Sequence, residues 1–297
     1  MGDAGAAQPL SQMDAVASTQ LRHRVEDRIR NWRVVVERTL ETASSFMAFG
    51  RRGNQPVVLK VVKYPGDEWR AGEILDLFDG SGVVRAYEHS EGAVLMEWLT
   101  PGHCLVEIVR NGRDDEATEI LGDVIDKMSP RAPLNETPTI KHWANGFERY
   151  AATGDAQIAR DLVEAGQRVY VQLCGSQSRP RLLHGDVQHY NVLSDSSRGW
   201  LAIDPKGVVG ELEYELGAIL RNPYERRELL SEPSTIEKRI RRLSSSLHLD
   251  ASRILAWAFA QAVLSAIWAF EDGVAVEPTN PSLALAQAIR PMLDARG

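Results

Sequence analysis

Three polar side chains near position 190 have the types and spacing of a reactive site: Asp186, Asn191 and Asp204. Residues 192–203 are typical of a small hairpin, because two short apolar runs flank a segment rich in turn-forming residues. Such a hairpin would bring Asn191 and Asp204 together at one end, with Asp186 in the loop just before it. We therefore expect two carboxylates and an amide to converge on one point.

This combination of side chains suits phosphoryl transfer. One aspartate can accept the proton of an attacking hydroxyl, while an asparagine and a second aspartate hold the Mg²⁺ that bridges the nucleotide phosphates. Mg²⁺ prefers oxygen ligands and takes only a few from the protein. The order His184-Gly185-Asp186, Asn191, Asp204 also follows the kinase patterns H-R-D-x-x-x-x-N and D-F-G. The sequence predicts Asp186 as the catalytic base, and Asn191 and Asp204 as the Mg²⁺ ligands.

Two other interpretations of the same stretch stay open at the level of the motif. His184, Asp186 and His189 could form the metal cluster of a hydrolase. Alternatively, Asp186 and Asn191 could cap a loop, as these residue types often do. A motif match is a hypothesis that its structural context has to support. The position of Asp204 favours the kinase interpretation, in which His184 supports the loop and transfers no proton.

Beyond the motif, the sequence resembles the aminoglycoside phosphotransferase branch of the kinase-like proteins, within it the streptomycin 6-kinase and hydroxyurea phosphotransferase group. The resemblance covers most of the chain and is carried by W-L-A-I-D-P-K-G at 200–207, V-G-E at 209–211, L-R-N-P at 220–223 and W-A-F-A-Q-A-V-L-S-A at 257–266. It implies an α+β, bilobal protein-kinase-like fold with a small antiparallel-sheet N-lobe and a larger helical C-lobe. It also implies ATP as the phosphate donor, with streptomycin-like aminoglycosides or hydroxyurea as acceptors.

The apolar patterning fits this arrangement of two lobes. We expect a disordered tail over 1–12, a nucleotide-binding N-lobe over 13–99 and a C-lobe with the catalytic loop and acceptor site over 100–297. Period-two and β-branched runs predict strands, and apolar periodicity of 3.6 residues predicts helices. The predicted N-lobe elements are a helix over 14–32, strands over 33–40, 45–50, 55–63, 83–88 and 93–96, and a helix over 67–78. The predicted C-lobe helices are 114–128, 139–152, 156–174, 213–221, 234–247, 251–270 and 281–294.

Lys60 lies on a predicted strand, in the place of the V-A-I-K lysine of kinases. An ammonium on a buried strand needs a partner, because an isolated buried charge is very costly. Glu73 is the preferred partner, since it lies among the inward-facing apolar residues of the next helix, and Glu68 is its competitor. Lys63 follows Lys60 by three residues and so points to the opposite face of the strand. We expect Lys60, paired with Glu73, to position the phosphates.

Residues 96–99 resemble the hinge segment of a kinase, in which backbone groups bind the adenine. By this resemblance Met96 would wall the nucleotide pocket, while the carbonyl of Glu97 and the N–H of Leu99 would bind the adenine edge. The alternative for this segment is a strand that ends in the Pro101-Gly102 turn.

The sequence departs from protein kinases in two places. The turn expected over the phosphates lacks G-x-G-x-x-G, although the backbone amides of Ser44 and Ser45 could still donate to phosphate. No activation segment or A-P-E follows Asp204, which favours a small-molecule acceptor over a protein. Glu215 falls where related enzymes often carry aspartate.

Composition narrows the partners and the compartment. The net charge of −7 argues against non-specific nucleic-acid binding and suits a cationic small molecule. Cys104 and Cys174 lie outside any C-x-x-C motif and indicate reduced thiols in a cytoplasmic protein. No secretory signal is evident, and the longest apolar stretch, 256–270, is interrupted by Gln261 and Ser265, so no membrane span is expected.

Rival functions stay open beside the aminoglycoside kinase. The same fold serves kinases of other small metabolites, because a fold does not fix a substrate. Two further rivals are the metal-dependent hydrolase and a catalytically silent kinase-like binding module. ATP turnover stimulated by streptomycin would separate the main interpretation from all three.

Overall fold

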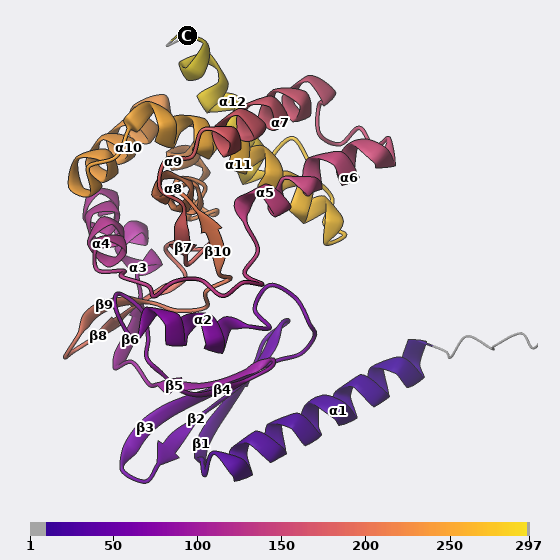
Figure 1. Ribbon diagram of the computed structural model, residues 1–297, viewed down its shortest axis with the longest axis vertical. Helices are drawn as coiled ribbons and strands as arrows, with labels where there is room; N and C mark the ends of the chain where they lie inside the picture. The colour runs from indigo at the N-terminus through magenta and orange to yellow at the C-terminus, as the bar shows by residue number, and fades with distance from the viewer. Residues whose placement is uncertain (1–9, 296–297) are drawn as a thin grey trace, which may run out of the picture. The chain divides into compact units, whose positions relative to one another are not determined.

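The computed structural model describes residues 10–295 and divides the chain into two compact units. The first unit comprises the described residues up to Asp76 together with Arg85–Trp98. The second comprises Leu77–Val84 together with the described residues from Leu99 onward (Figure 1). Each unit has its own hydrophobic core.

Two of the predicted boundaries differ from this division. Residues 1–9 of the predicted tail lie outside the described residues, and residues 10–12 begin helix α1 (Leu10–Asn31). Residues 77–84, expected in the N-lobe, belong to the second unit. The reason is backbone pairing: the Gly82 carbonyl accepts from the Ala202 N–H, and the Val84 N–H donates to the Ala202 carbonyl, both at 2.9 Å.

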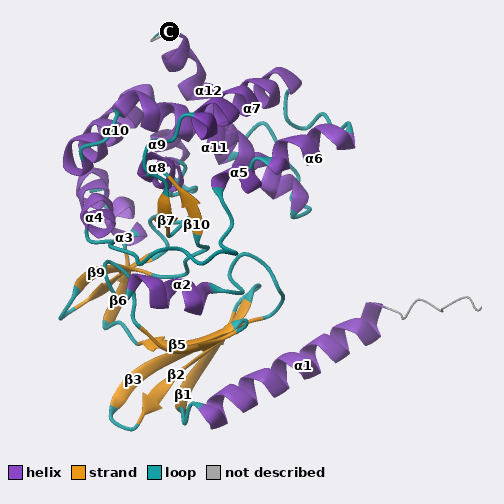
Figure 2. Cartoon of the chain, viewed as in Figure 1, coloured by secondary structure: helices purple, strands orange, loops and turns teal. Residues whose placement is uncertain are grey.

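The first unit is built on a five-stranded antiparallel sheet of order β1-β2-β3-β5-β4 (Figure 2). Its strands are β1 (Val35–Glu41), β2 (Ser45–Arg52), β3 (Gln55–Val62), β4 (Ala86–Ser90) and β5 (Ala93–Glu97). The β-branched run of β3 places it in the middle of the sheet, where its last six residues are buried. Val25 of α1 packs with Leu59 and Leu95 of the sheet in one core. This part of the predicted fold is confirmed.

The second unit is mostly helical and includes the last two residues of helix α2 (Ala71–Phe78). Its helices are α3 (Val106–Arg110), α4 (Asp114–Asp126), α5 (Ile140–Trp143), α6 (Asn145–Thr153), α7 (Arg160–Gly175), α8 (Leu212–Leu220), α9 (Arg227–Ser231), α10 (Pro233–Leu247), α11 (Ala251–Glu271) and α12 (Pro281–Asp294). Its strands are β6 (Pro101–Cys104), β7 (Arg181–Leu183), β8 (Val192–Asp195), β9 (Gly199–Ala202) and β10 (Val208–Gly210). The predicted helix 139–152 is interrupted at Ala144. Strands of three or four residues are too short to show a period-two pattern in the sequence.

Helix α11 forms the centre of the second unit and packs against α6, α7, α8, α10 and α12. It is apolar on nearly every side, and Trp257, Phe259 and Leu264 are among its buried side chains. Its length and composition would allow it to cross a membrane, but 67% of its most apolar window is buried inside the protein. Such burial is typical of the core helix of a globular domain.

Candidate active site

The predicted hairpin is present in the second unit. Strands β8 and β9 pair antiparallel, with Val192 opposite Ala202 and Asp195 opposite Gly199. The Asp195 carboxylate closes the turn, because it accepts hydrogen bonds from the backbone N–H groups of Ser197 at 2.9 Å and Arg198 at 3.0 Å. Residues 184–191 form the loop between β7 and β8, so the hairpin holds both ends of the predicted catalytic motif in place.

The hairpin brings Asp186 and Asn191 into direct contact. The Asn191 side-chain amide donates to the Asp186 carboxylate at 3.2 Å and to the Asp186 carbonyl at 3.0 Å. The Ile203 N–H donates to the Asn191 carbonyl at 2.8 Å, which ties the residue before Asp204 to the loop. Asp204 itself has a φ of 59°, a left-handed conformation that a non-glycine residue seldom adopts. Such conformations concentrate at functional sites, where the surroundings hold them.

His184 holds the same segments by both ring nitrogens. Its Nδ1 accepts from the Asp186 N–H at 3.3 Å, so its Nε2 carries the proton that is donated to the Ile203 carbonyl at 3.0 Å. The side chain is fully buried, and this burial lowers the pKa of His184 to about 3. His184 is therefore neutral at pH 7 and connects the loop to the strand end that precedes Asp204.

Glu215 is the residue of this site whose role the sequence did not indicate. It lies in the first turn of α8, and its side chain is 2% exposed. Both carboxylate oxygens accept from the Gly185 N–H at 3.0 Å, and one of them accepts from the Val187 N–H at 3.2 Å. Burial raises the pKa of Glu215 to about 7. The only signal in the sequence was an acidic residue at a position where relatives carry aspartate.

The hydrolase alternative is not supported by the arrangement of the side chains. Within residues 10–295, no group of three or more His, Cys, Asp or Glu side chains is placed to hold a metal ion. Both ring nitrogens of His184 are used in hydrogen bonds to the backbone. His189 is fully buried, and burial lowers its pKa well below the usual value.

Lys60 is buried on β3 as predicted, but its partner is different. Its side chain is 4% exposed, and its Nζ lies 2.8 Å from the carboxylate of Glu68. Glu73 pairs instead with Arg70, at 2.6 Å, one helical turn away. The predicted Lys60–Glu73 pair is therefore wrong. Helix α2 begins at Ala71, four residues later than predicted, so residues 67–70 form turns that place Glu68 against β3.

The turn between β1 and β2 contradicts the prediction that the backbone amide of Ser45 donates to a phosphate. The backbone N–H of Ser45 donates to Thr42 Oγ1 at 3.0 Å, and the Ser45 carbonyl accepts from the Thr42 N–H at 2.8 Å. The Ser45 amide is thus used inside the turn and is not presented to a phosphate. Ser44 is exposed, and its carbonyl accepts from the Lys63 N–H at 2.8 Å.

The hinge-like segment lies where the chain leaves the first unit. Met96 is buried on β5, and the Glu97 N–H donates to the Arg85 carbonyl at 3.0 Å. The Glu97 carboxylate also accepts from the Arg85 N–H at 2.8 Å, so this residue is fixed within the sheet. Leu99 is buried and is the first residue of the chain to return to the second unit. Adenine binding by Met96, Glu97 and Leu99 stays a prediction.

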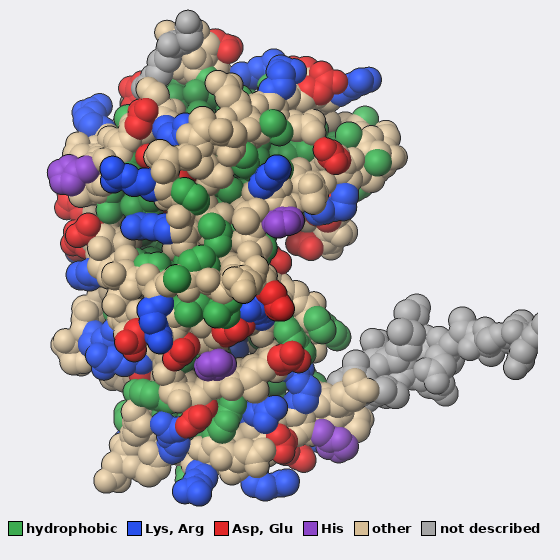
Figure 3. Space-filling view, in the orientation of Figure 1, with side chains coloured by type: hydrophobic (Ala, Val, Ile, Leu, Met, Phe, Trp, Pro, Cys, Tyr) green, Lys and Arg blue, Asp and Glu red, His purple; other side chains and the backbone are tan. Residues whose placement is uncertain are grey.

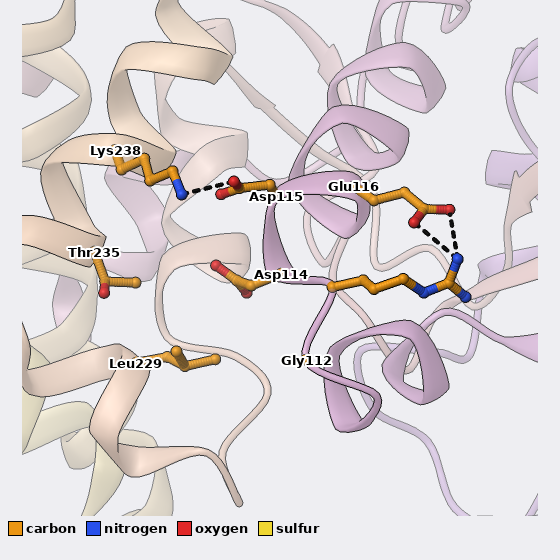
Figure 4. A pocket seen from close by; sticks show the side chains of 8 residues that line it. Gly112, Asp114, Asp115, Glu116, Leu229, Thr235 and Lys238 are labelled. Atoms are coloured by element: carbon orange, nitrogen blue, oxygen red, sulfur yellow. Dashed lines mark hydrogen bonds and ion pairs between the residues drawn. The ribbon is translucent and has the colours of Figure 1, made fainter.

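A pocket of about 430 Å³ in the second unit lies apart from these residues (Figure 4). It is lined mainly by residues 112–116, at the start of α4, and by Thr235 and Lys238 of α10. Its charges are largely paired: Lys238 lies 2.6 Å from Asp115, and Arg113 lies 2.9 Å from Glu116. None of the residues predicted for the active site lines it.

The fold is that of the kinase-like phosphotransferases. A solved structure of a thermostable mutant of aminoglycoside phosphotransferase APH(4)-Ia, in a ternary complex with ADP and hygromycin B, superposes with a TM-score of 0.63. The two sequences are 15% identical, and the match covers 92% of this chain and 98% of that structure. At this identity the likeness shows the fold alone.

The sequence comparisons identify the family. The family model described as aminoglycoside/hydroxyurea antibiotic resistance kinase matches residues 31–273, and the chain belongs to this family. It is 34% identical to a streptomycin 3''-kinase from Klebsiella pneumoniae, over 82% of this chain and 92% of that protein. It is 28% identical to a streptomycin 6-kinase from Streptomyces griseus, over 77% of this chain and 75% of that protein. The expected family is confirmed: the chain is an ATP-dependent phosphotransferase that acts on a hydroxyl group of a small molecule.

Proposed function

We propose that this protein transfers the γ-phosphate of ATP to a hydroxyl group of streptomycin or a closely similar aminoglycoside. Asp186 accepts the proton of that hydroxyl, and Asn191 and Asp204 hold Mg²⁺. The observation that carries the proposal is the hydrogen bond from Asn191 to the Asp186 carboxylate, together with the backbone bond from Ile203 to Asn191. These two bonds tie Asn191 to Asp186 and to the residue before Asp204, at one end of one hairpin.

The chemistry of the donor set fits Mg²⁺. The nitrogen of the Asn191 amide is used by Asp186, which leaves the amide oxygen as the end that can bind a cation. Asp204 supplies a carboxylate, and hard oxygen donors are the ligands that Mg²⁺ prefers. When bound, the ion neutralises charge on the nucleotide phosphates. The chain itself contributes the left-handed backbone at Asp204 and the tether before it, which fix where the two oxygens lie.

Lys60 is the candidate phosphate contact of the first unit. Its ammonium is buried and paired with Glu68, which is the arrangement that keeps a kinase lysine charged and oriented for phosphate. The proposed role of the lysine's partner is kept, but Glu68 takes the place that was predicted for Glu73.

The acceptor class rests on the relatives. Two of them are named as streptomycin kinases, and they differ in the hydroxyl that they phosphorylate. The higher identity to the 3''-kinase favours the 3'' position over the 6 position. The net charge of −7 suits a cationic acceptor. Basic and acidic side chains are interspersed over the face shown in Figure 3.

The test is ADP release with ATP and Mg²⁺, measured in the presence of streptomycin, other aminoglycosides or hydroxyurea. We expect turnover stimulated by streptomycin, with a product whose phosphorus couples to the proton at the 3'' carbon in NMR spectra. Coupling at carbon 6 would correct the position and keep the reaction. ATP binding without stimulation by any of these acceptors would overturn the proposed substrate class.

A further inference from the structure

Arg221 lies beside the proposed catalytic base. It is the first residue after α8, and its guanidinium nitrogen lies 3.7 Å from the Asp186 carboxylate. The side chains of Arg221 and Asp186 are only 11% and 21% exposed. An ion pair so largely removed from water is screened much less than a surface pair. Arg221 follows directly on α8, and α8 also contacts the loop through Glu215.

The position of the guanidinium is fixed by helix α11. Arg221 Nη1 donates to Gln261 Oε1 at 2.9 Å, and the Gln261 amide nitrogen donates to the Tyr214 carbonyl. Gln261 is 3% exposed, so its amide has few other orientations. A Cβ at Gly217 would press against Gln261 Oε1, which explains why a glycine stands at this point of α8. The glutamine therefore sets where the arginine can lie.

The Asp186 carboxylate is consequently held from two sides. One oxygen faces Arg221, at 3.7 Å, and the other accepts from the Asn191 amide, at 3.2 Å. Contacts on both oxygens restrict rotation of the carboxylate about its side-chain bond. Orientation matters for a base, because proton transfer requires it to lie within hydrogen-bond reach of the hydroxyl.

We propose that Arg221 is a positioning residue for phosphoryl transfer, which holds the Asp186 carboxylate in the orientation that receives the acceptor proton. The inference rests on the proposed function, in which Asp186 is the base. Gln261 acts one step further away, by fixing the guanidinium. A misplacement of about 1 Å in a reacting group can cost on the order of 10²-fold in rate, so the loss of Arg221 should reduce turnover.

The test compares Arg221→Gln and Arg221→Lys with the unaltered protein in steady-state kinetics with ATP, Mg²⁺ and streptomycin. We expect kcat to fall about 10- to 100-fold in Arg221→Gln, with the KM for ATP changed less than twofold, because only orientation of the base is lost. Arg221→Lys keeps the charge but not the planar guanidinium, and should lie between the two. A third variant, Arg221→Ala, removes the whole side chain beyond Cβ. Added guanidinium ion at millimolar concentration should raise the kcat of this variant and leave that of the unaltered protein unchanged.

Arg226→Gln is the matched control. Arg226 lies five residues further along the same segment, donates to the Val109 carbonyl at 3.0 Å and pairs with Glu228. Its loss should affect stability without lowering kcat per folded molecule. An Arg221→Gln kcat within twofold of the unaltered protein, or an equal loss in Arg226→Gln, would overturn the inference alone. An unaltered protein with no acceptor-dependent turnover would overturn the proposed function and this inference with it.

Discussion

Both carboxylate oxygens of Glu215 accept a hydrogen bond from the backbone N–H of Gly185, each at 3.0 Å. Gly185 has a φ of 86°, in the left-handed region that favours glycine. A Cβ at this position would also lie 3.2 Å from Trp143. One buried acid at the start of α8 therefore fixes the backbone from which the Asp186 side chain projects.

The first prediction concerns the pH dependence that Glu215 gives to stability. Its pKa is about 7 in the folded protein, above the 4.5 that is usual for a glutamate. A carboxyl with a raised folded pKa binds more protons in the folded state, so its contribution to stability falls as pH rises from about 4.5 to about 7, by up to ~1.4 kcal/mol per pH unit. Unfolding by urea at pH 5.5, 6.5 and 7.5 should show this slope in the unaltered protein and not in Glu215→Gln. Equal slopes in the two proteins would contradict the assignment.

The second prediction separates Glu68 from Glu73. Glu68→Gln replaces the carboxylate that lies 2.8 Å from the buried Lys60 ammonium by a neutral amide, which should cost about 2 kcal/mol in the free energy of unfolding. It should also weaken ATP binding at least tenfold, since the lysine loses its fixed position. Glu73→Gln removes only the partly exposed pair with Arg70 and should stay within about 0.5 kcal/mol. Urea unfolding and ATP titration of both variants measure this, and similar losses in the two would show that the pairing is misassigned.

The third prediction tests the packing of α8 on α11. Alanine favours a helix over glycine by about 1 kcal/mol. Gly217→Ala should nevertheless destabilise the protein by about 1–3 kcal/mol, because its Cβ would press on the buried Gln261 amide. Gly122→Ala on α4 is the control: there the closest atom is the hydroxyl oxygen of Ser246, 3.0 Å away, which a side-chain rotation can move. A Gly217→Ala variant as stable as Gly122→Ala would be evidence against a close contact.

The sequence was sufficient to predict the hairpin and the approach of Asn191 to Asp186, because these signals are local. Turn formers over 194–199 separate two apolar runs, and Asp186, Asn191 and Asp204 lie at fixed offsets from them. The central strand with Lys60 was predicted for the same reason, since a β-branched run identifies it.

The contacts that the sequence did not reveal join residues far apart in the chain. Glu215 was seen as an acid at the start of a helix, but its partner Gly185 lies 30 residues earlier and uses a backbone N–H. The Lys60 partner was misassigned because residues 67–70 suit a helix or a turn equally well, and only packing decides where α2 begins. Propensity locates the elements, whereas tertiary packing selects the partners of their side chains.

The most direct test of the central claim is a single-turnover measurement of phosphate transfer by Asp186→Asn, with saturating ATP, Mg²⁺ and streptomycin. The variant keeps the size of the side chain but cannot accept the hydroxyl proton, so the rate should fall at least about 10²-fold. ATP affinity, measured by calorimetry, should change less than threefold. Asp195→Asn is the control, because that carboxylate closes the hairpin turn and accepts from the Thr100 N–H at 3.1 Å, so its loss should reduce stability, with the rate per folded molecule retained. A transfer rate in Asp186→Asn close to that of the unaltered protein would contradict the assignment of Asp186 as the base.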